Sequence, residues 1–508
     1  MPARFNAAAW LVDRHAEEGR LECTAICADA ELSYGHVLAN VNRTGNALRE
    51  LGVRAGDRVL LALLDGPEFI YAFLGAIKIG AVPVPTNTLY TPRDHAYVWG
   101  DCDPRVAIVS ESLLPAVSDA RTSKTRLVVA GQGDISFADW IGAASAELTP
   151  QDTASEAVAF WLYTSGTTGL PVAAVHRQRD ILVCCEGFGR HVLEITETDR
   201  CYSVAKLFFA YGLGNSLYYP FSVGASTCLF PGRPEPRRVF EIIARDRPTL
   251  LFAVPTAFAS MLRTAESDGI RDLAAVRRCL SAGEALPPGI YERWRARFGV
   301  ELLDGLGSTE MCNTFIANRA GEARPGSSGR LVPGYDARIL DDQGHDAPDG
   351  TVGDLVVRGA SACACYWNDL ERTERAFLGD WLKTGDRYSR DRDGYFWYAG
   401  RADDMMKAGG MWVSPIEVEA ALLDHDAVLE AGVVGAPNAD QLVKPVAFVV
   451  LVPGRVATPA LEEELREFVR QRLAPYKHPR RIVFTNELPK TATGKIQRFR
   501  LRERAGTL

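Results

Sequence analysis

The pattern that most constrains the fold is an alternation of strand-like and helix-like segments between residues 58 and 84. Residues 58–64 form an apolar run that predicts a buried strand. After Pro67, apolar residues recur at helical spacing as far as Ile77, and Gly80 ends this pattern before a second strand-like run at 81–84. Strand, helix and strand at this spacing predict a parallel α/β unit. Similar alternation continues to about residue 330, so we predict a layered α/β domain.

The pattern changes after residue 330. Short alternating runs separated by Gly-Asp and Asp-Gly turns indicate a small β-rich subdomain. A last unit begins near Asp403, and its predicted elements are helices at 415–423 and 459–472 and strands at 430–435 and 447–451. The predicted fold class is therefore α/β: a large N-terminal domain of α/β layers with a small β subdomain (1–402), followed by a mobile α+β lid domain (403–508). The hinge is predicted near Asp403.

Charge is distributed unevenly along the chain. The net charge is −7, yet residues 471–508 hold ten Lys or Arg against two Asp or Glu, which leaves −15 on the remainder. A basic end on an acidic body is typical of a nucleic-acid arm, a membrane-surface patch or a lid over a phosphorylated substrate. Interspersed prolines and the apolar run 482–484 favour a folded end over a disordered tail.

Cysteine and hydropathy patterns narrow the compartment. The 11 cysteines are odd in number and contain no C-x-x-C pair, which predicts a reduced, cytoplasmic protein without a zinc ribbon. The first residues lack the apolar core of a secretory signal. The long uncharged run 207–232 is interrupted by glycines, Pro220 and polar residues, so we expect a buried or cleft-lining segment and no membrane span.

Four short motifs combine glycine, hydroxyl and charged residues. Residues 163–171 (YTSGTTGLP) supply donors that can surround phosphate oxygens, although a solvated turn has the same composition and the Gly-Lys-Ser/Thr of a Walker A loop is missing. Residues 304–310 (DGLGSTE) place Glu310 beside two hydroxyls, which suits Mg²⁺ shared with phosphates but also fits a surface turn. The third motif pairs Asp386 with Arg401. The fourth, 488–496 (LPKTATGKI), puts Lys495 on a glycine-hinged loop.

Together, and in this order, these motifs resemble the adenylate-forming superfamily of acyl-CoA synthetases, adenylation domains and luciferases. The segments 205–215 (AKLFFAYGLGN), 281–286 (SAGEAL) and 488–498 are similar to benzoate-CoA ligases, and the resemblance covers about residues 30–505. It implies an AMP-forming aromatic acid-CoA ligase. A carboxylate and ATP would give an aryl-adenylate and pyrophosphate, and CoA would then take the aryl group and release AMP. ATP and CoA are the implied co-substrates, with Mg²⁺ as cofactor.

The resemblance also implies roles for residues at matching positions. The β- and γ-phosphates would be bound by Thr164, Ser165, Gly166, Thr167, Thr168 and Gly169, and adenine would be framed by Gly283, Glu284, Ala285, Asp304, Gly305 and Leu306. The implied catalytic residues are Thr309 at the α-phosphate, Glu310 as the Mg²⁺ ligand and Lys495 between the attacking carboxylate and the α-phosphate. Asp386 would bind the ribose hydroxyls and Arg401 the ribose and phosphate edge.

For the thioester step, the resemblance implies rotation of the lid about Asp403. This rotation would move Lys495 out and bring in the CoA-binding residues Lys407, Gly409, Gly410 and Trp412. The two glycines suit a pantetheine arm that passes close to the backbone.

One position departs from the family pattern. The phosphate loop normally continues Pro-Lys-Gly, whereas here it reads Pro171-Val172-Ala173, so the lysine is absent. Our hypothesis is that adenylation survives with weaker binding of pyrophosphate. Either His176 or Arg177 supplies the missing positive charge, or this charge is not required.

The predicted aryl-acid pocket combines aromatic and small residues. Its members are Phe209, Ala210, Tyr211, Gly212, Gly307 and Asn313. Small residues beside aromatics make a flat slot for a planar ring, closed to long alkyl chains. Asn313 stands where benzoate ligases tend to have His, and an amide can both donate and accept, which suggests an amino or hydroxyl substituent on the ring.

Three functions remain open at this point. The favoured one is an aryl-CoA ligase, and the second is an enzyme that loads an aryl acid onto a separate carrier protein. The third is a nucleotide-binding pseudoenzyme, suggested by Val172 and opposed by Lys495, Glu310, Asp386 and Arg401. A small aromatic acid, ATP and CoA are the expected partners, without nucleic acid or membrane, and a homodimer is one open alternative.

Overall fold

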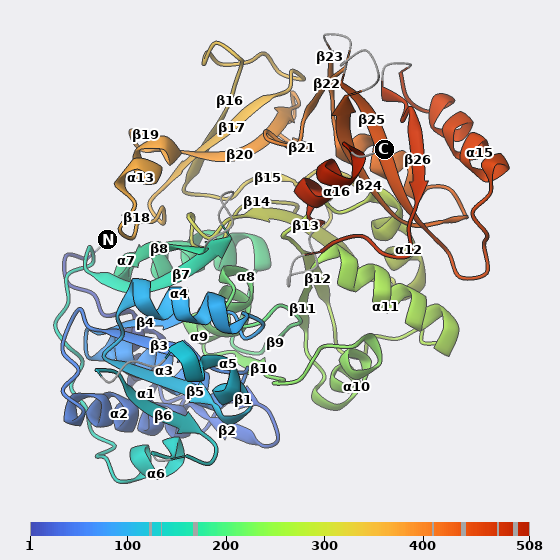
Figure 1. Ribbon diagram of the computed structural model, residues 1–508. Coiled ribbons are helices and arrows are strands. Elements are labelled where there is room, and N and C mark those ends of the chain that lie inside the picture. Colours follow the sequence, from blue (N-terminus) through green and yellow to red (C-terminus); the bar gives the residue numbers. More distant parts are fainter. Residues whose placement is uncertain are drawn as a thin grey trace.

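The protein is described here by a computed structural model (Figure 1). It describes residues 2–120, 124–133, 135–165, 171–408, 411–437, 443–474, 477–490 and 496–506.

The predicted parallel α/β unit is confirmed. β3 (Arg58–Ala62), α3 (Pro67–Lys78) and β4 (Val82–Pro85) follow one another along the chain, and β3 pairs in parallel with β4 and with β5 (Val106–Ser110). β6 (Arg126–Ala130) adds to β5, which gives the order β4-β3-β5-β6. α2 (Tyr34–Glu50) begins at the cap residue Ser33, whose hydroxyl accepts from His36 N at 3.2 Å.

A larger sheet runs through the N-terminal part. In the described residues it has nine strands in the order β15-β14-β13-β12-β11-β9-β10-β1-β2. The strands are β1 (Thr24–Cys27), β2 (Glu31–Ser33), β9 (Arg200–Ser203), β10 (Ser226–Cys228), β11 (Leu250–Ala253), β12 (Arg278–Ser281), β13 (Leu302–Gly307), β14 (Thr314–Ala317) and β15 (Arg330–Leu331). The central strands pair in parallel, and α10 (Pro236–Asp246), α11 (Pro255–Asp268) and α12 (Pro288–Phe298) connect them.

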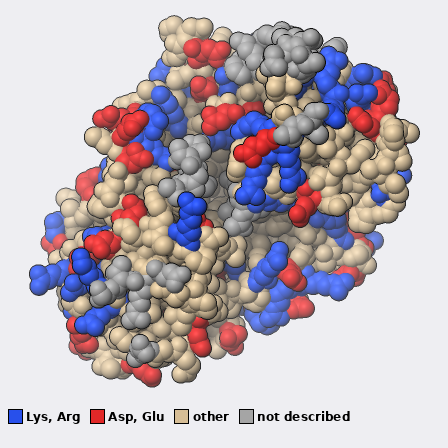
Figure 2. Space-filling view, viewed as in Figure 1, with Lys and Arg blue, Asp and Glu red and all other residues tan. Residues whose placement is uncertain are grey.

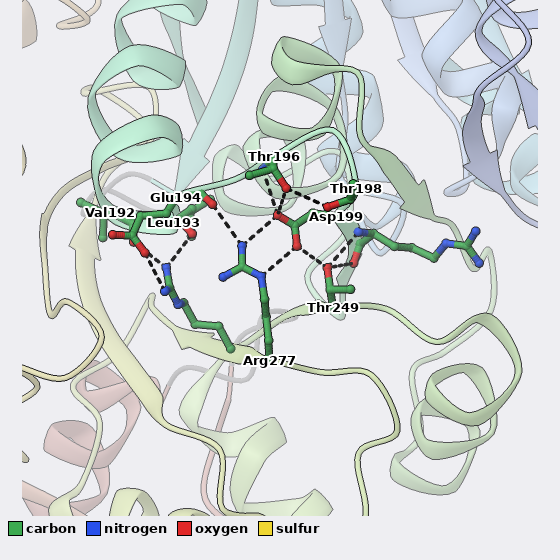
Figure 3. A network of polar contacts seen from close by, with 10 residues as sticks. Val192, Leu193, Glu194, Thr196, Thr198, Asp199, Thr249 and Arg277 are labelled. Atoms are coloured by element: carbon green, nitrogen blue, oxygen red, sulfur yellow. Dashed lines mark hydrogen bonds and ion pairs between the residues drawn. The ribbon is translucent and has the colours of Figure 1, made fainter. Parts of the chain in front are cut away.

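A polar network ties the amino-terminal ends of these strands together (Figure 3). Arg277 binds the Asp199 carboxylate through Nε and Nη2 at 2.9 and 2.8 Å. Thr249 Oγ1 donates to Asp199 Oδ1 at 2.6 Å, and Thr196 N donates to Oδ2 at 2.9 Å. Because these residues precede β9, β11 and β12, the network aligns the starts of the strands and leaves their carboxyl ends for the functional segments.

Two smaller sheets complete the N-terminal part. β7 (Val158–Ser165) and β8 (Pro171–Arg177) are antiparallel, and β18 (Cys365–Tyr366) pairs with β8. The predicted β-rich subdomain is present as β16 (Tyr335–Leu340), β17 (Gly353–Gly359), β19 (Phe377–Leu378), β20 (Trp381–Arg390) and β21 (Phe396–Arg401).

The last unit contains the predicted helices and strands. β24 (Val428–Pro437), β25 (Val443–Leu451) and β26 (Arg481–Phe484) form one sheet, which packs with α14 (Pro415–Leu423), α15 (Pro459–Arg470) and α16 (Arg498–Ala505). A hairpin of β22 (Met406–Ala408) and β23 (Met411–Val413) lies at its start. Figure 2 shows basic side chains gathered over α16, beside a hollow in this face.

The uncharged run 207–232 is largely buried, as expected, and contains helices and the strand β10. α8 (Ala210–Leu213) and α9 (Tyr219–Val223) flank a helical turn at Gly214–Tyr218 whose residues are buried. In the part of the chain that the structure describes, no helix is both long and apolar enough to cross a membrane.

Candidate active site

Three predicted site segments follow strands of the larger sheet. Residues 205–212 follow β9, residues 282–286 follow β12, and the turn 308–313 follows β13. β9, β11, β12 and β13 are neighbours and run in parallel, so their carboxyl ends lie at one edge. The sheet therefore brings together the segments predicted for the aromatic acid, adenine and the α-phosphate, at the edge where open α/β sheets bind ligands.

Thr309 and Glu310 lie in a tight turn between β13 and β14. Cys312 N donates to Thr309 O at 3.0 Å, and Cys312 has a φ of 68°, a left-handed conformation that is uncommon for residues other than glycine. Such strained backbone persists where the surrounding structure fixes it from several sides.

Hydrogen bonds from outside the turn hold three consecutive carbonyls. Thr309 O accepts from His176 Nε2 at 2.8 Å, Glu310 O from Cys363 N at 2.7 Å, and Met311 O from Ser361 Oγ at 2.9 Å. The donors come from β8 and from the loop before β18. The turn that presents the two predicted catalytic side chains is therefore anchored to a different sheet.

The Glu310 carboxylate is suited to a shared magnesium ion. The Tyr366 hydroxyl donates to Glu310 Oε1 at 2.7 Å, and burial together with the charge of Glu310 raises the pKa of Tyr366. Oε2 has no hydrogen-bond partner among the described residues. Nowhere in that part of the chain do three or more His, Cys, Asp or Glu form a cage for a metal ion. A single carboxylate fits Mg²⁺ that keeps water and takes its other ligands from phosphates.

Asp386 and Arg401 face each other across two strands. They are Cα partners on β20 and β21, and Arg401 Nη1 donates to Asp386 Oδ1 and to Thr384 O, each at 3.0 Å. The Arg401 side chain is 39 % exposed and that of Asp386 13 %. A carboxylate and a guanidinium are thus held side by side, and their assignment to the ribose and phosphate edge stays a prediction.

The predicted adenine segment contains a buried carboxyl group. Asp304 Oδ2 accepts weakly from Leu286 N at 3.5 Å, whereas Oδ1 is buried without a partner among the described residues. Burial raises the pKa of Asp304 well above its usual value. Gly283 has a φ of +90°, which favours glycine. A buried carboxyl group and a left-handed glycine thus lie in the segments predicted for adenine.

The predicted aryl-acid segment folds back on itself, so that Gly212 packs against the backbone of residues 205–206. An added Cβ at Gly212 would lie 2.0 Å from Lys206 O, so only glycine fits there. Tyr211 Oη donates to Leu280 O at 2.9 Å, and the Phe208 and Phe209 rings are 4.3 Å apart. Gly307 is equally confined, with an added Cβ 2.6 Å from Asn313 O.

Asn313 connects this segment to the turn. Its Nδ2 donates to Ala210 O at 2.8 Å, and its Oδ1 accepts from Thr314 N and Thr314 Oγ1, each at 2.9 Å. A backbone carbonyl on one side and a backbone N–H on the other fix which amide atom is oxygen. One amide N–H is left without a partner among the described residues, so toward a ligand Asn313 can act only as a donor.

Several predicted residues lie outside the described residues. These are Gly166, Thr167, Thr168, Gly169, Gly409, Gly410 and Lys495. Of Ser165, Lys407 and Trp412 only the backbone is described: Ser165 pairs with Pro171, and Lys407 with Trp412. Thr164 is described and pairs with Val172 on β8. The phosphate-loop assignment, including that of Thr164, and the CoA and lysine assignments stay predictions.

The predicted substitutes for the missing lysine are wrong. His176 is fully buried, and both ring nitrogens are engaged, by Thr309 O and by the Asp180 carboxylate. Arg177 Nη1 donates to Ala362 O at 3.3 Å, and its Nε lies 3.5 Å from Glu156. Val172 itself is buried in a small apolar cluster with Ala174, Cys363, Tyr366 and neighbours. Neither His176 nor Arg177 is therefore placed to replace the lysine.

The sequence did not reveal the residues that position the acidic turn. Tyr366, Cys363 and Ser361 lie more than 45 residues beyond the turn, and His176 lies 133 residues before Thr309. No local spacing links them to it, because the contacts form only when the β18-β8-β7 sheet packs against the turn.

Near the predicted hinge, ion pairs attach α16 to the turn that follows β21. Arg502 Nη1 binds Asp404 Oδ1 at 2.8 Å, and Arg498 binds Asp404 at 3.5 Å and Glu419 at 2.7 Å. Asp404 thus belongs to the C-terminal unit by its contacts. Arg498, one of the basic residues of the C-terminal end, pairs within its own unit.

The fold, with its large N-terminal part and smaller C-terminal unit, is that of an adenylate-forming enzyme. Comparison with known families agrees: the AMP-binding enzyme model matches residues 12–367, and the AMP-binding enzyme C-terminal domain model matches residues 417–495. The chain belongs to the AMP-binding enzyme family.

Within the family, the chain is similar to ligases of aromatic acids. It is 46 % identical to a benzoate–CoA ligase of Thauera aromatica over 99 % of this chain and 96 % of that protein. It is 41 % identical to a 4-hydroxybenzoate–CoA/benzoate–CoA ligase of Rhodopseudomonas palustris, with 99 % and 95 % covered. The crystal structure of the anthranilate CoA ligase AuaEII in complex with anthranoyl-AMP superposes with a TM-score of 0.95 at 40 % identity, covering 100 % of this chain and 98 % of that one.

Proposed function

We propose that the protein is an AMP-forming aryl-CoA ligase. The reaction joins an aromatic carboxylate to ATP with release of pyrophosphate, and then transfers the aryl group to the thiol of CoA with release of AMP. The observation that supports it most strongly is the juxtaposition of the pocket, adenine and Thr309–Glu310 segments at one sheet edge. Identity of 46 % to a benzoate–CoA ligase over nearly the whole chain supports the same reaction.

In the adenylation step, the protein positions reactants and stabilises charge. Thr164 and the loop that follows it would hold the terminal phosphates, and Thr309 would meet the α-phosphate. Glu310 would bind Mg²⁺, which supplies positive charge beside the phosphates. Asp386 and Arg401 would hold the ribose, and Lys495 would bridge the carboxylate and the α-phosphate.

In the thioester step, the C-terminal unit would turn about Asp403. Lys407, Gly409, Gly410 and Trp412 would then line the path of the pantetheine arm. Because Asp404 is bound to α16 by Arg498 and Arg502, the pivot falls before Asp404. Arg502 Nη1 also donates to the backbone oxygen of Asp403 at 3.4 Å, so α16 contacts the proposed pivot residue through its backbone.

The hydrogen bonds of the Asn313 amide limit which ring substituents of the aromatic acid it can bind. Its oxygen is occupied by Thr314 and its nitrogen by Ala210, so its remaining N–H can pair only with an acceptor. A ring hydroxyl oxygen accepts well, whereas an aromatic amino group accepts poorly because its lone pair is delocalised. We therefore propose benzoate and hydroxybenzoates as substrates ahead of 2-aminobenzoate. The similarity to AuaEII makes 2-aminobenzoate the competing outcome.

The second candidate reaction transfers the aryl group to a separate carrier protein. Both reactions share the adenylation step and differ only in the thiol that attacks. We also propose a cytoplasmic location, which cell fractionation tests. A homodimer is a further proposal, which sedimentation of the purified protein tests.

Pyrophosphate exchange tests the substrate proposal. Wild type is given benzoate, 3- and 4-hydroxybenzoate, 2-aminobenzoate and a medium-chain fatty acid. Benzoate and a hydroxybenzoate should give the highest kcat/KM, and Asn313→Leu should lower the value for the hydroxybenzoate more than for benzoate. Preference for the fatty acid would refute the flat pocket, and preference for 2-aminobenzoate would refute the donor role of Asn313.

A further inference from the structure

His176 connects the two sheets that form the nucleotide site. It lies on β8, the strand that follows the 164–169 segment, and its Nε2 is 2.8 Å from Thr309 O. A carbonyl oxygen only accepts, so Nε2 carries the hydrogen. The imidazole thus donates across the boundary between the β7–β8 sheet and the turn that carries Thr309 and Glu310.

The imidazole is fixed on its other sides as well. Nδ1 lies 2.9 Å from Asp180 Oδ2, and both side chains are fully buried. Asp180 Oδ2 also accepts from Arg177 N at 2.9 Å at the start of α7 (Gln178–Cys184). The ring of Phe160 on β7 stacks on the imidazole at 4.9 Å with 16° between the planes. These contacts leave the ring one orientation, with Nε2 toward Thr309.

The bonded carbonyl belongs to a backbone that needs support. Thr309 O closes the strained turn by accepting from Cys312 N, and the carbonyls of the next two residues are held by Cys363 and Ser361. Those two donors come from the loop before β18, whereas His176 is the donor from β8. His176 therefore joins β8 directly to the turn, beside the contacts that Cys363 and Tyr366 make from the β18 side.

We propose that His176, oriented by Asp180, is a positioning residue for adenylation: it aligns the residues at the α-phosphate and the metal with the loop that binds the outer phosphates. This role rests on the proposed function, since it assumes ATP in that site. His176 touches no reactant and acts through the Thr309 carbonyl. Displacing a reacting group by about 1 Å costs on the order of 100-fold in rate, so loss of this contact should be visible in catalysis.

His15 serves as the control, because it is a second buried histidine that binds a backbone oxygen. His15 is also fully buried, its Nε2 is 2.8 Å from the backbone oxygen of Phe221, and its ring packs on Tyr34 at 4.4 Å. Its bond joins α1 (Arg14–Glu17) to α9, and neither helix contains a predicted site residue. Replacing either histidine with Leu removes one buried donor from one carbonyl.

The experiment compares His176→Leu, His176→Gln, His176→Asn and His15→Leu. Pyrophosphate exchange gives kcat and KM, Mn²⁺ paramagnetic resonance with ATP gives metal–nucleotide binding, and thermal unfolding gives stability. We expect His176→Leu to lose more stability than His15→Leu, because it also leaves the buried Asp180 carboxylate without its partner. His176→Leu should lose about 30-fold or more in kcat and about tenfold in Mn²⁺–ATP affinity, whereas His15→Leu stays within about threefold. Gln can still donate to Thr309 O and should restore most of the loss, and Asn is too short to do so.

Equal effects of His176→Leu and His15→Leu on kcat and binding would overturn the proposal. If His176→Leu does not fold, the Gln and Asn variants decide, and equal activity of these two overturns it. The Mn²⁺–ATP measurement contains no carboxylic acid. Wild type that exchanges no pyrophosphate with any acid therefore refutes the proposed function separately from the positioning role.

Discussion

Gly212→Ala should damage the aryl-acid pocket far more than one methyl group suggests. The added Cβ would lie 2.0 Å from Lys206 O and 2.5 Å from Ala205 O, and both are backbone atoms. Ordinary contact begins near 3.4 Å, so α8 and residues 205–206 must separate by about 1.4 Å. A shift of that size at a substrate-positioning segment corresponds to about 100-fold in rate, or roughly 2.7 kcal/mol of transition-state stabilisation.

Pyrophosphate exchange with benzoate measures this effect. We expect kcat/KM for benzoate to fall about 30- to 100-fold and KM for ATP to stay within about threefold, because the nucleotide residues lie on other segments. Gly142→Ala is the control, since an added Cβ at Gly142 meets nothing within 4 Å. If Gly212→Ala keeps kcat/KM for benzoate within twofold of wild type, residues 205–212 do not form the pocket.

Two further predictions concern charge near the site. Burial raises the pKa of Asp65 to about 6, against about 3.9 in an unfolded chain, so its contribution to stability is complete below about pH 4 and is lost as the pH rises through 6. The free energy of unfolding of Asp65→Asn relative to wild type should therefore rise by about 3 kcal/mol between pH 4 and pH 7 in urea titrations, and a flat difference would contradict this pKa. Val172→Lys places an ammonium group on the face of β8 that packs against Tyr366, the partner of Glu310. KM for ATP should fall severalfold, at a stability cost of about 1–3 kcal/mol. Unchanged KM for ATP and an unchanged adenylation rate would show that this position is irrelevant to ATP binding.

The elements that could be predicted are those with strong local patterns. The β3–α3–β4 unit followed from apolar periodicity and from Gly80, which ends the helical pattern. The uncharged run 207–232 was correctly placed inside the fold, because its glycines and proline do not suit a membrane helix.

The polar contacts that shape the site could not be predicted in this way. His176 looked available to replace a lysine because sequence does not show burial, yet its neighbours Phe160 and Asp180 enclose it. Asn313 looked able to donate and accept, but Thr314 and Ala210 occupy three of its hydrogen-bonding positions. In both cases the partners come from folding the chain, and local spacing gives no sign of them.

The central claim is that one chain adenylates an aromatic acid and transfers it to CoA. Purified protein incubated with benzoate, ATP, Mg²⁺ and CoA is analysed by mass spectrometry for benzoyl-CoA and AMP. We expect benzoyl-CoA and AMP in equal amounts, and their formation should depend on all four components. The rate should fall at least about 100-fold in Lys495→Ala, on the order expected for loss of a charge-stabilising group. Aryl-adenylate that accumulates without thioester when CoA is present would contradict it.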